Sequence, residues 1–362
     1  MRLQITSRRL AGLAVAGLAA IAPASASAHG GGGGSVYTES NAAANTVQVF
    51  NQAPDGTLTP GDAYLTGGAG TGAAGLGSQG ALAIDHDWLL AVNAGSNDIS
   101  AFRIRGGHLV LVDRVPSGGT TPNSVTIHDG VVYVLNSGGT GNISGFLLRR
   151  HGLIPLSGAT QPLSSTTAGA VQVSFTPAGD QLVVSEKGAN TIETYPVDRW
   201  GRAGAGTAHA SAGAAPFGFS FGKHDSLNVT EAGASALTSY ALTPFAAITA
   251  SLVNGQGAAC WATSTSNGRY TFTADAATDA ISAYSEDWNG TLSLVTPGGA
   301  TAQLAAGTHP LDEAISNDRY LYVNGGTTGQ ISAFKIGGNG SLTPLGAAGA
   351  MPAGFGGLVV GS

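Results

Sequence analysis

Seven polar residues occupy the same place in a repeated sequence pattern, directly after short apolar runs that favour β-strands. They are Glu39, Asn93, Asn136, Glu186, Glu231, Asp275 and Asn324. If equivalent strands end at one rim, these side chains form a ring of acids and amides that can bind a cation or a polyol. Glu186 and Glu231 are the predicted catalytic bases, because a carboxylate can accept a proton from a reacting group. Alternatively, the Asn and Asp residues start the following turn through their own backbone, a role that glutamate fills poorly.

A positive charge and two aromatic rings are predicted close to this rim. Lys187 follows Glu186 and is one of three lysines, so it either binds a substrate anion or is an ordinary surface residue. Phe217 and Trp261 begin predicted inner strands and either floor a ligand pocket or pack in the core. Cys260 has no histidine near it in its repeat, so we expect a small buried residue and not a nucleophile.

His309 is the imidazole best placed for acid–base chemistry. The segment Thr308-His309-Pro310-Leu311-Asp312 leads into a predicted inner strand, so His309 is a predicted catalytic residue and Asp312 a predicted substrate-binding residue at the channel mouth. Three His-Asp pairs recur elsewhere, at His86-Asp87, His128-Asp129 and His224-Asp225. They fall in the same turn of different repeats, and equivalent turns lie far apart, so we expect no joint metal or catalytic site.

The elements that position these residues follow from an internal repeat. An aliphatic residue, two spacers and an aromatic residue recur seven times, and the aromatic residues lie 44 to 52 positions apart. They are Phe50, Phe102, Phe146, Tyr195, Tyr240, Tyr284 and Phe334. This spacing is typical of a four-stranded propeller blade. The sequence therefore predicts an all-β, seven-bladed β-propeller with the seven aromatic residues in its core.

The two ends of the repeat region predict how the ring closes. The first repeat begins at Val36-Tyr37-Thr38 without an innermost strand, whereas Gly356-Gly357-Leu358-Val359-Val360 is left over at the C-terminus. An open ring would leave two unpaired strand edges. We expect the C-terminal strand to complete the N-terminal blade.

These patterns together resemble the seven-bladed lactonase family, which includes 6-phosphogluconolactonase-like and 3-carboxymuconate-lactonizing propellers. The resemblance rests on the blade pattern, on Pro216-Phe217-Gly218-Phe219-Ser220-Phe221 and on the Gly-rich segment 66–72, and it covers residues 35–362. It implies a His, two Arg and a Glu around one mouth of the channel. The family's Glu falls on Glu231, but Phe217-Gly218, Val171 and Ala276 stand where the other three would be.

Composition restricts the partners and the compartment. Arg2, Arg8 and Arg9, an apolar run over 10–22 and Ala26-Ser27-Ala28 predict a signal peptide over 1–28, with a glycine tether over 29–34 and the propeller over 35–362. We expect a secreted or periplasmic protein exported by the general or the twin-arginine route. With a net charge of −6 and no basic cluster, no nucleic-acid partner is expected. No later apolar run is long enough for membrane insertion, and we expect a monomer.

No cofactor is expected either. Gly70-Thr71-Gly72-Ala73-Ala74-Gly75 matches a dinucleotide-binding pattern but opens no predicted helix. Two functions remain open. One is a lactone hydrolase or cycloisomerase with a rebuilt site, and the other is a non-catalytic propeller that binds a glycan, a protein or a small ligand. In both, a small molecule or carbohydrate is expected at the channel mouth.

Overall fold

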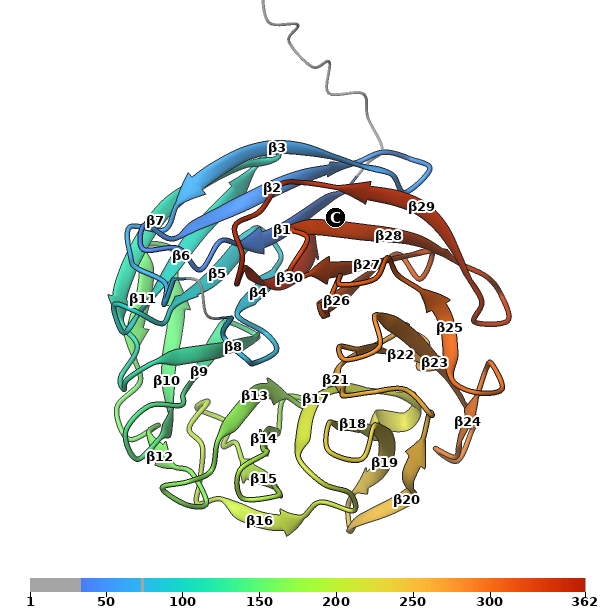
Figure 1. Ribbon diagram of the computed structural model, residues 1–362. Helices are drawn as coiled ribbons and strands as arrows, with labels where there is room; N and C mark the ends of the chain where they lie inside the picture. Colours follow the sequence, from blue (N-terminus) through green and yellow to red (C-terminus); the bar gives the residue numbers. More distant parts are fainter. Residues whose placement is uncertain (1–33, 73–74, 362) are drawn as a thin grey trace, which may run out of the picture. The chain divides into compact units, whose positions relative to one another are not determined.

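Short strands separated by glycine-rich turns make up the structure, a computed structural model that describes residues 34–72 and 75–361. The predicted signal peptide and all of the predicted tether except Gly34 lie outside these residues. Seven antiparallel sheets are arranged as a ring of blades (Figure 1), which confirms the predicted seven-bladed β-propeller. We use the word channel for the centre of this ring. Within the described residues, no helix is long and apolar enough to cross a membrane.

Five blades contain four strands, and blades 3 and 6 contain five, because two short strands share their outer edge. The strands follow sequence order from the centre of the ring outward, except that blade 1 takes its innermost strand from the C-terminus. The innermost strands of blades 1 to 7 are β30 (Gly356–Gly361), β4 (Leu82–Asp85), β8 (Pro122–His128), β13 (Ala170–Phe175), β17 (Pro216–Phe221), β21 (Ala259–Ser264) and β26 (Pro310–Ser316). The second strands are β1 (Ser35–Glu39), β5 (Trp88–Asn93), β9 (Val131–Asn136), β14 (Gln181–Glu186), β18 (Leu227–Glu231), β22 (Tyr270–Asp275) and β27 (Tyr320–Gly325).

The outer half of each blade contains the repeated aliphatic–aromatic pattern in its third strand. The third strands are β2 (Thr46–Gln52), β6 (Asp98–Arg105), β10 (Asn142–Arg149), β15 (Thr191–Pro196), β19 (Ala236–Leu242), β23 (Ala280–Glu286) and β28 (Gln330–Ile336). The outer strands are β3 (Leu58–Leu65), β7 (His108–Pro116), β11 (Gly152–Pro155) with β12 (Gln161–Pro162), β16 (Thr207–Ala210), β20 (Phe245–Val253), β24 (Leu292–Leu294) with β25 (Ala300–Gln303), and β29 (Leu342–Ala348). The only helical turn in the described chain is a 3-10 turn at Lys223–Asp225.

Ring closure is as predicted. Strand β30 pairs antiparallel with β1, with Val360 opposite Val36 and Leu358 opposite Thr38. The Thr38 hydroxyl also donates to the Gly357 carbonyl at 2.7 Å. Each innermost strand contacts the next one around the channel, including β26 with β30 and β30 with β4. The C-terminal strand therefore joins the first and last blades.

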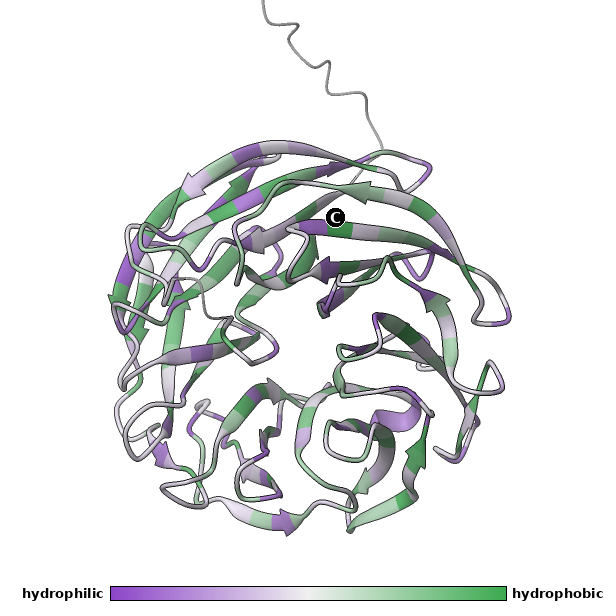
Figure 2. Ribbon diagram, in the orientation of Figure 1, coloured by the Kyte–Doolittle hydropathy of each residue, from purple (hydrophilic) through white to green (hydrophobic). Residues whose placement is uncertain are grey.

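The seven repeated aromatic residues are core residues, each at most 3% exposed. Each lies in a cluster with residues of the preceding blade, as Phe102 does with Tyr37 and Val47, and Tyr195 with Tyr133. Apolar positions recur along the strands of every blade (Figure 2). The repeated pattern thus marks the contacts between blades, which explains why it recurs once per blade.

Two faces of the ring differ in the turns that they present. The start of each innermost strand pairs with the end of the second strand, as Pro122 does with Asn136 and Ala259 with Asp275. We call this face, which also contains the connections between blades, the mouth face. The turns between first and second strands, and between third and fourth strands, lie on the opposite face.

Candidate functional site

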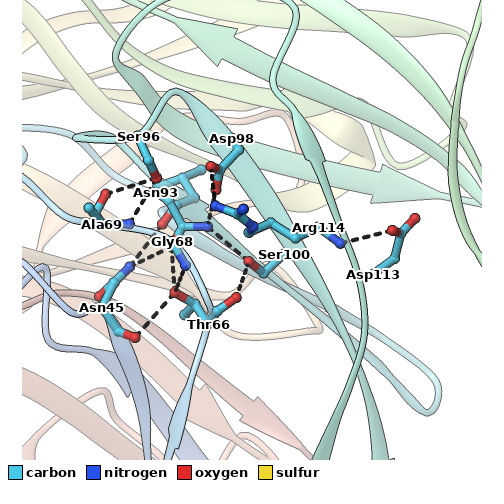
Figure 3. A network of polar contacts seen from close by, with 11 residues as sticks. Asn45, Thr66, Gly68, Ala69, Asn93, Ser96, Asp98, Ser100, Asp113 and Arg114 are labelled. Atoms are coloured by element: carbon cyan, nitrogen blue, oxygen red, sulfur yellow. Dashed lines mark hydrogen bonds and ion pairs between the residues drawn. The ribbon is translucent and has the colours of Figure 1, made fainter.

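The seven polar residues predicted to form a ring all lie on the mouth face, but each is at most 1% exposed. Their side chains bind to other parts of the protein. Asn93 donates to Asp98 Oδ1 at 2.7 Å and to Ser100 Oγ at 2.8 Å, and its Oδ1 accepts from Thr66 Oγ1 at 2.7 Å (Figure 3). Thr66 belongs to the connection that leaves blade 1. Asn93 therefore joins the second and third strands of blade 2 to the incoming chain.

The same arrangement recurs at Asn136 and Asp275. Asn136 Nδ2 donates to Ser144 Oγ at 3.1 Å, and Asp275 Oδ2 accepts from Ser282 Oγ at 2.6 Å. Both serines belong to the repeated pattern, seven or eight residues after the polar residue. A serine at this spacing indicates that the polar residue bonds to the third strand and not to its own turn.

Glu186 and Glu231, the predicted bases, are also enclosed. Glu186 accepts from the backbone N–H of Ser164 at 3.1 Å and from the Ser164 hydroxyl. Glu231 Oε1 accepts from the Gly213 N–H at 2.7 Å and from Thr238 Oγ1 at 2.6 Å. Its Oε2 is buried without a hydrogen-bond partner. A catalytic role for either carboxylate stays a prediction, and it requires a path for substrate past the connections at 164 and 213.

A long connection between β3 and β4 crosses the mouth of the channel. Its residues 78–80 bond to four other blades. The Gly80 N–H donates to Asp312 Oδ1 of blade 7 at 3.4 Å. The Gln79 N–H donates to the Val171 carbonyl at 3.2 Å, and the Ser78 carbonyl accepts from Trp261 Nε1 at 2.9 Å. The Gly80 carbonyl accepts from the Val125 N–H at 2.8 Å. We call residues 75–80 the mouth loop.

The mouth loop supplies hydrogen bonds that blade 5 cannot make, because blade 5 has a glycine where other blades have a polar side chain. The third residue of an innermost strand commonly bonds to the backbone of the next innermost strand, as Gln172 does to Phe219 N–H at 2.7 Å. Blade 5 has Gly218 at that position. The Gln79 carboxamide instead donates to the Ala262 carbonyl at 2.7 Å and accepts from the Ala262 N–H at 3.0 Å. The mouth loop therefore covers Gly218 and bonds to Val171, two positions where the resemblance to the lactonases placed catalytic residues.

We expect Gly218→Ala to destabilise the protein by about 1–3 kcal/mol, the usual cost of overfilling a packed site. A Cβ on residue 218 would overlap the Gln79 carboxamide oxygen and lie 2.8 Å from the Cys260 carbonyl. Thermal unfolding measures the effect. Gly338→Ala is the matched control, because no atom lies within 4 Å of a Cβ there. Equal unfolding midpoints for the two variants would contradict this account of the mouth loop.

Beside the mouth loop lies a cavity of about 360 Å³, which we call the mouth pocket. Trp261, His309 and Asp312 line it together with residues 75–78 and 353–356. Burial raises the pKa of Asp312 to about 7, and its Oδ2 accepts from the Gly357 N–H at 2.9 Å. The His309 side chain is exposed, while its backbone N–H donates to Asp279 at 2.7 Å. A carboxyl group that changes charge near neutral pH thus shares a pocket with an imidazole.

Lys187 and Phe217 extend this group of residues. The Lys187 ammonium lies 4.9 Å from the centre of the Phe217 ring, which contacts Trp261 edge-on at 5.0 Å. A Cβ on Gly77, which lines the mouth pocket, would lie 3.9 Å from Lys187 Nζ. The structure therefore brings together five of the ten predicted site residues: Lys187, Phe217, Trp261, His309 and Asp312. The other five do not line the mouth pocket, because hydrogen bonds to their own blades and to the connections between blades enclose them. They are Asn93, Asn136, Glu186, Glu231 and Asp275.

Cys260 neighbours this group but lacks the character of a nucleophile. Burial raises the pKa of its thiol to about 12, so the thiolate is scarce at neutral pH. Among the described residues, no group of three or more His, Cys, Asp or Glu side chains could hold a metal ion.

One buried acid of β26, Glu313, was not recognised in the sequence, and the burial of Glu39 in the predicted polar ring was not foreseen. Glu313 is 5% exposed and both of its carboxyl oxygens lack a hydrogen bond of good geometry. Burial, then the charges of Asp275 and Asp312, raise its pKa well above the ordinary value. Glu39 behaves similarly, chiefly through burial. The equivalent residues of other blades, such as Val173 and Ala262, are apolar and buried, so the repeat does not mark an acid at this position.

These acids predict that the protein is more stable at pH 5 than at pH 8. Burial raises the pKa of Asp275, Asp312 and Glu193 to about 7 each. In the unfolded chain such groups release their protons near pH 4. Between about pH 4 and pH 7 the folded state binds more protons, so the free energy of unfolding falls as pH rises through this window. Thermal unfolding midpoints across the range measure the slope.

Asp275→Asn should flatten that slope, because it removes one of the titrating groups. Burial lowers the pKa of His209, which makes the free energy of unfolding rise with pH. This is one group, whereas several acids have a raised pKa, so the acids determine the slope. An unfolding midpoint that rises from pH 5 to pH 8 would contradict the prediction.

Comparisons with known proteins agree with this fold. Residues 36–151 match the family model "Lactonase, 7-bladed beta-propeller". The predicted resemblance to seven-bladed lactonases is thereby confirmed. No curated protein matches the chain.

Solved structures with the same fold include enzymes of different reaction classes. A periplasmic gluconolactonase of Pseudomonas aeruginosa is 16% identical, with a TM-score of 0.74 over 91% of this chain and 99% of that one. A putative 6-phosphogluconolactonase of Bacteroides fragilis is 19% identical, with a TM-score of 0.71 over 91% and 98%. A virginiamycin B lyase of Staphylococcus aureus is 12% identical, with a TM-score of 0.54 over 73% and 83%. Because one scaffold serves hydrolases and lyases, the function must be argued from the site.

Proposed function

We propose that this seven-bladed propeller, similar to the lactonase family, hydrolyses a neutral, hydroxylated lactone in the mouth pocket. The observation that carries the proposal is the position of Asp312. Its carboxyl group lines the pocket beside His309 and Trp261 and has a pKa raised to about 7 by burial. A general base is most effective when its pKa lies near the working pH.

The chemistry assigns one role each to Asp312 and His309, which line the pocket, and to Lys187, whose ammonium group lies next to Gly77 at its edge. The Asp312 carboxylate accepts a proton from the attacking water, and the lactone carbonyl carbon gains the new C–O bond. The ring C–O bond breaks as His309, in its protonated form, donates a proton to the departing ring oxygen. The Lys187 ammonium stabilises the developing oxyanion and then the product carboxylate. The products are one hydroxy acid and no other fragment.

The lining of the pocket favours an uncharged substrate. Trp261 and Leu311 give the pocket apolar surface. Phe217 packs against Trp261 behind this lining, and Lys187, which lies over the Phe217 ring, is the one cation that we assign to the site. Several cations normally gather around a phosphate, so a phosphorylated lactone is a poor fit. The gluconolactonase of similar fold acts, by its name, on a neutral lactone. A signal peptide over 1–28 would place the activity in the periplasm or outside the cell, where the gluconolactonase also lies.

A binding propeller without catalysis is the second candidate. Two observations support it. Three of the four residues that the lactonase resemblance implies are absent, and the mouth loop covers two of their positions, 171 and 218. Such a protein would hold a carbohydrate in the mouth pocket without turning it over.

A panel of neutral and phosphorylated lactones, assayed by acid release, tests the proposal. We expect turnover of at least one neutral lactone by the protein from residue 29 onward. The Glu186→Gln and Glu231→Gln variants are assayed in parallel. Loss of lactone turnover in either variant would indicate that a buried glutamate, and not Asp312, is the catalytic base. A folded protein that turns over no lactone, but shifts its unfolding midpoint with one, would favour the binding propeller.

A further inference from the structure

A second and larger cavity lies on the face opposite the mouth. It has a volume of about 640 Å³ and is lined by turns of three consecutive blades, at 176–181, 223–226 and 288–290. A hollow of about 460 Å³ continues it toward Ser266 and Asn267. Both are lined by Lys223, His224, Asp225 and Trp288. We call the two together the opposite-face cavity, and nothing in the proposed lactone chemistry uses it.

Trp288 stands at the junction of the two parts and is 76% exposed. Large aromatic side chains usually bury most of their surface. The turn that presents Trp288 is fixed, because Asp287 Oδ1 accepts from the backbone N–H groups of Asn289 and Thr291, both at 3.0 Å. The protein therefore holds an indole ring in solvent on a well-defined turn.

The turn on the other side of the cavity is equally well anchored. Glu286, which is 3% exposed, accepts from the Lys223 N–H at 3.1 Å, from the Ser226 hydroxyl and from Asn228 Nδ2 at 2.7 Å. His224 and Asp225 both have positive φ angles, of 50° and 62°. Two adjacent residues other than glycine in this region are uncommon, and such strain is found most often where side chains must be held in place.

The side chains around Trp288 are hydrogen-bonding groups of mixed charge. Lys223 is positive, Asp180 and Asp225 are negative, and Gln181 and Asn289 are neutral amides. Asp180 is already oriented, because its Oδ1 accepts from Thr176 Oγ1 at 2.9 Å. A strongly charged ligand would meet a repelling group here, whereas hydroxyl groups can bond to every one of these side chains.

We propose that the opposite-face cavity binds a neutral oligosaccharide, with one sugar ring stacked on Trp288. The flat C–H face of a pyranose matches an exposed indole ring, and the sugar hydroxyls match the surrounding carboxylates, amides and ammonium group. The volume lies within the range of pockets that hold small ligands. The lining extends over three blades, from residues 176–181 of blade 4 to Asn267 of blade 6, which suits a short chain of sugars more than a single ring. This site is independent of the proposed lactone hydrolysis.

Trp288→Ala is the decisive variant, and Trp200→Ala is its matched control. Trp200 is 60% exposed on the corresponding turn of blade 4, where Asp198 Oδ1 accepts from its N–H at 2.8 Å. It lines neither part of the cavity. Both substitutions remove a solvent-exposed indole from an Asp-stabilised turn, so their effects on folding should be alike.

Isothermal titration with hexasaccharides of glucose, xylose and N-acetylglucosamine in different linkages measures binding. We expect saturable binding of at least one of them, weakened about 10-fold or more by Trp288→Ala, which is about 1.4 kcal/mol, and unchanged by Trp200→Ala. Asp312→Asn should leave this binding intact, which separates the site from the mouth pocket. Absence of binding to the whole panel, or equal effects of the two tryptophan substitutions, would overturn the proposal.

Discussion

A chain that ends at Pro352 is expected to aggregate or to show no cooperative unfolding, although it loses only ten residues. The deletion removes β30 and the fully buried Phe355. It exposes the backbone edge of β1, which otherwise pairs from Ser35 to Glu39. It also removes the contacts of β30 with β26 and β4, so blade 1 loses its innermost strand and the ring loses its closure. Unpaired strand edges promote association between chains.

Sedimentation and calorimetry of the truncated protein measure the outcome. Deletion of Ser362 alone is the control, since it leaves β30 complete. A peptide of residues 353–362 added to the truncated chain should recover some monomer if its edge is free to pair. A truncated protein that stays monomeric with an unchanged unfolding midpoint would contradict closure by β30.

Asp312→Asn is expected to reduce kcat/KM for the best lactone by about 10²–10⁴-fold, the usual contribution of a general base. Asparagine keeps one oxygen that can accept from the Gly357 N–H, so the 2.9 Å hydrogen bond between β26 and β30 survives the substitution, and only the longer bond from the Gly80 N–H, at 3.4 Å, is lost. The variant should therefore fold, and the loss should lie in the chemistry. Asp129→Asn, which changes an exposed carboxylate on the opposite face, should leave kcat/KM unchanged.

The pH profile distinguishes a base from a residue that only supports the pocket. Since burial raises the pKa of Asp312 to about 7, the carboxylate fraction increases from pH 6 to pH 8. After subtraction of the hydroxide-driven reaction, kcat/KM of the unmodified protein should rise with the carboxylate fraction on the acid side of its optimum. The Asp312→Asn variant should lack that rise. Equal profiles for both proteins would remove Asp312 from the mechanism.

Much of the fold was predictable because the repeat records contacts between neighbouring blades. One repeated aromatic residue occurs in each blade, and its ring packs on the preceding blade, as Phe102 and Tyr195 show. The C-terminal strand at 356–360 was also predictable, because the N-terminal blade was the one that lacked an innermost strand. These are local patterns with a fixed relation to the fold, so a single sequence was enough to read them.

The site was only partly predictable, because its decisive contacts join distant parts of the chain. His309 and Asp312 could be placed at the mouth from their position before and within an inner strand. The bond from Gln79 to Ala262 spans 183 residues and has no local signature. The role of each buried acid depends on whether it lines a cavity, which Asp312 does and Glu231 does not.

Gln79 of the mouth loop makes the hydrogen bonds that a side chain at position 218 of blade 5 could otherwise make, and this has a consequence for related sequences. Gln79 occupies the space beside Gly218 and bonds to the strand that residue 218 would otherwise reach. A larger residue at 218 is compatible only with loss of the Gln79 side chain, and loss of Gln79 leaves Ala262 unbonded unless 218 gains a polar group. Positions 79 and 218 should therefore covary, so that homologues with a histidine or glutamine at 218 carry a shorter or differently routed connection before β4.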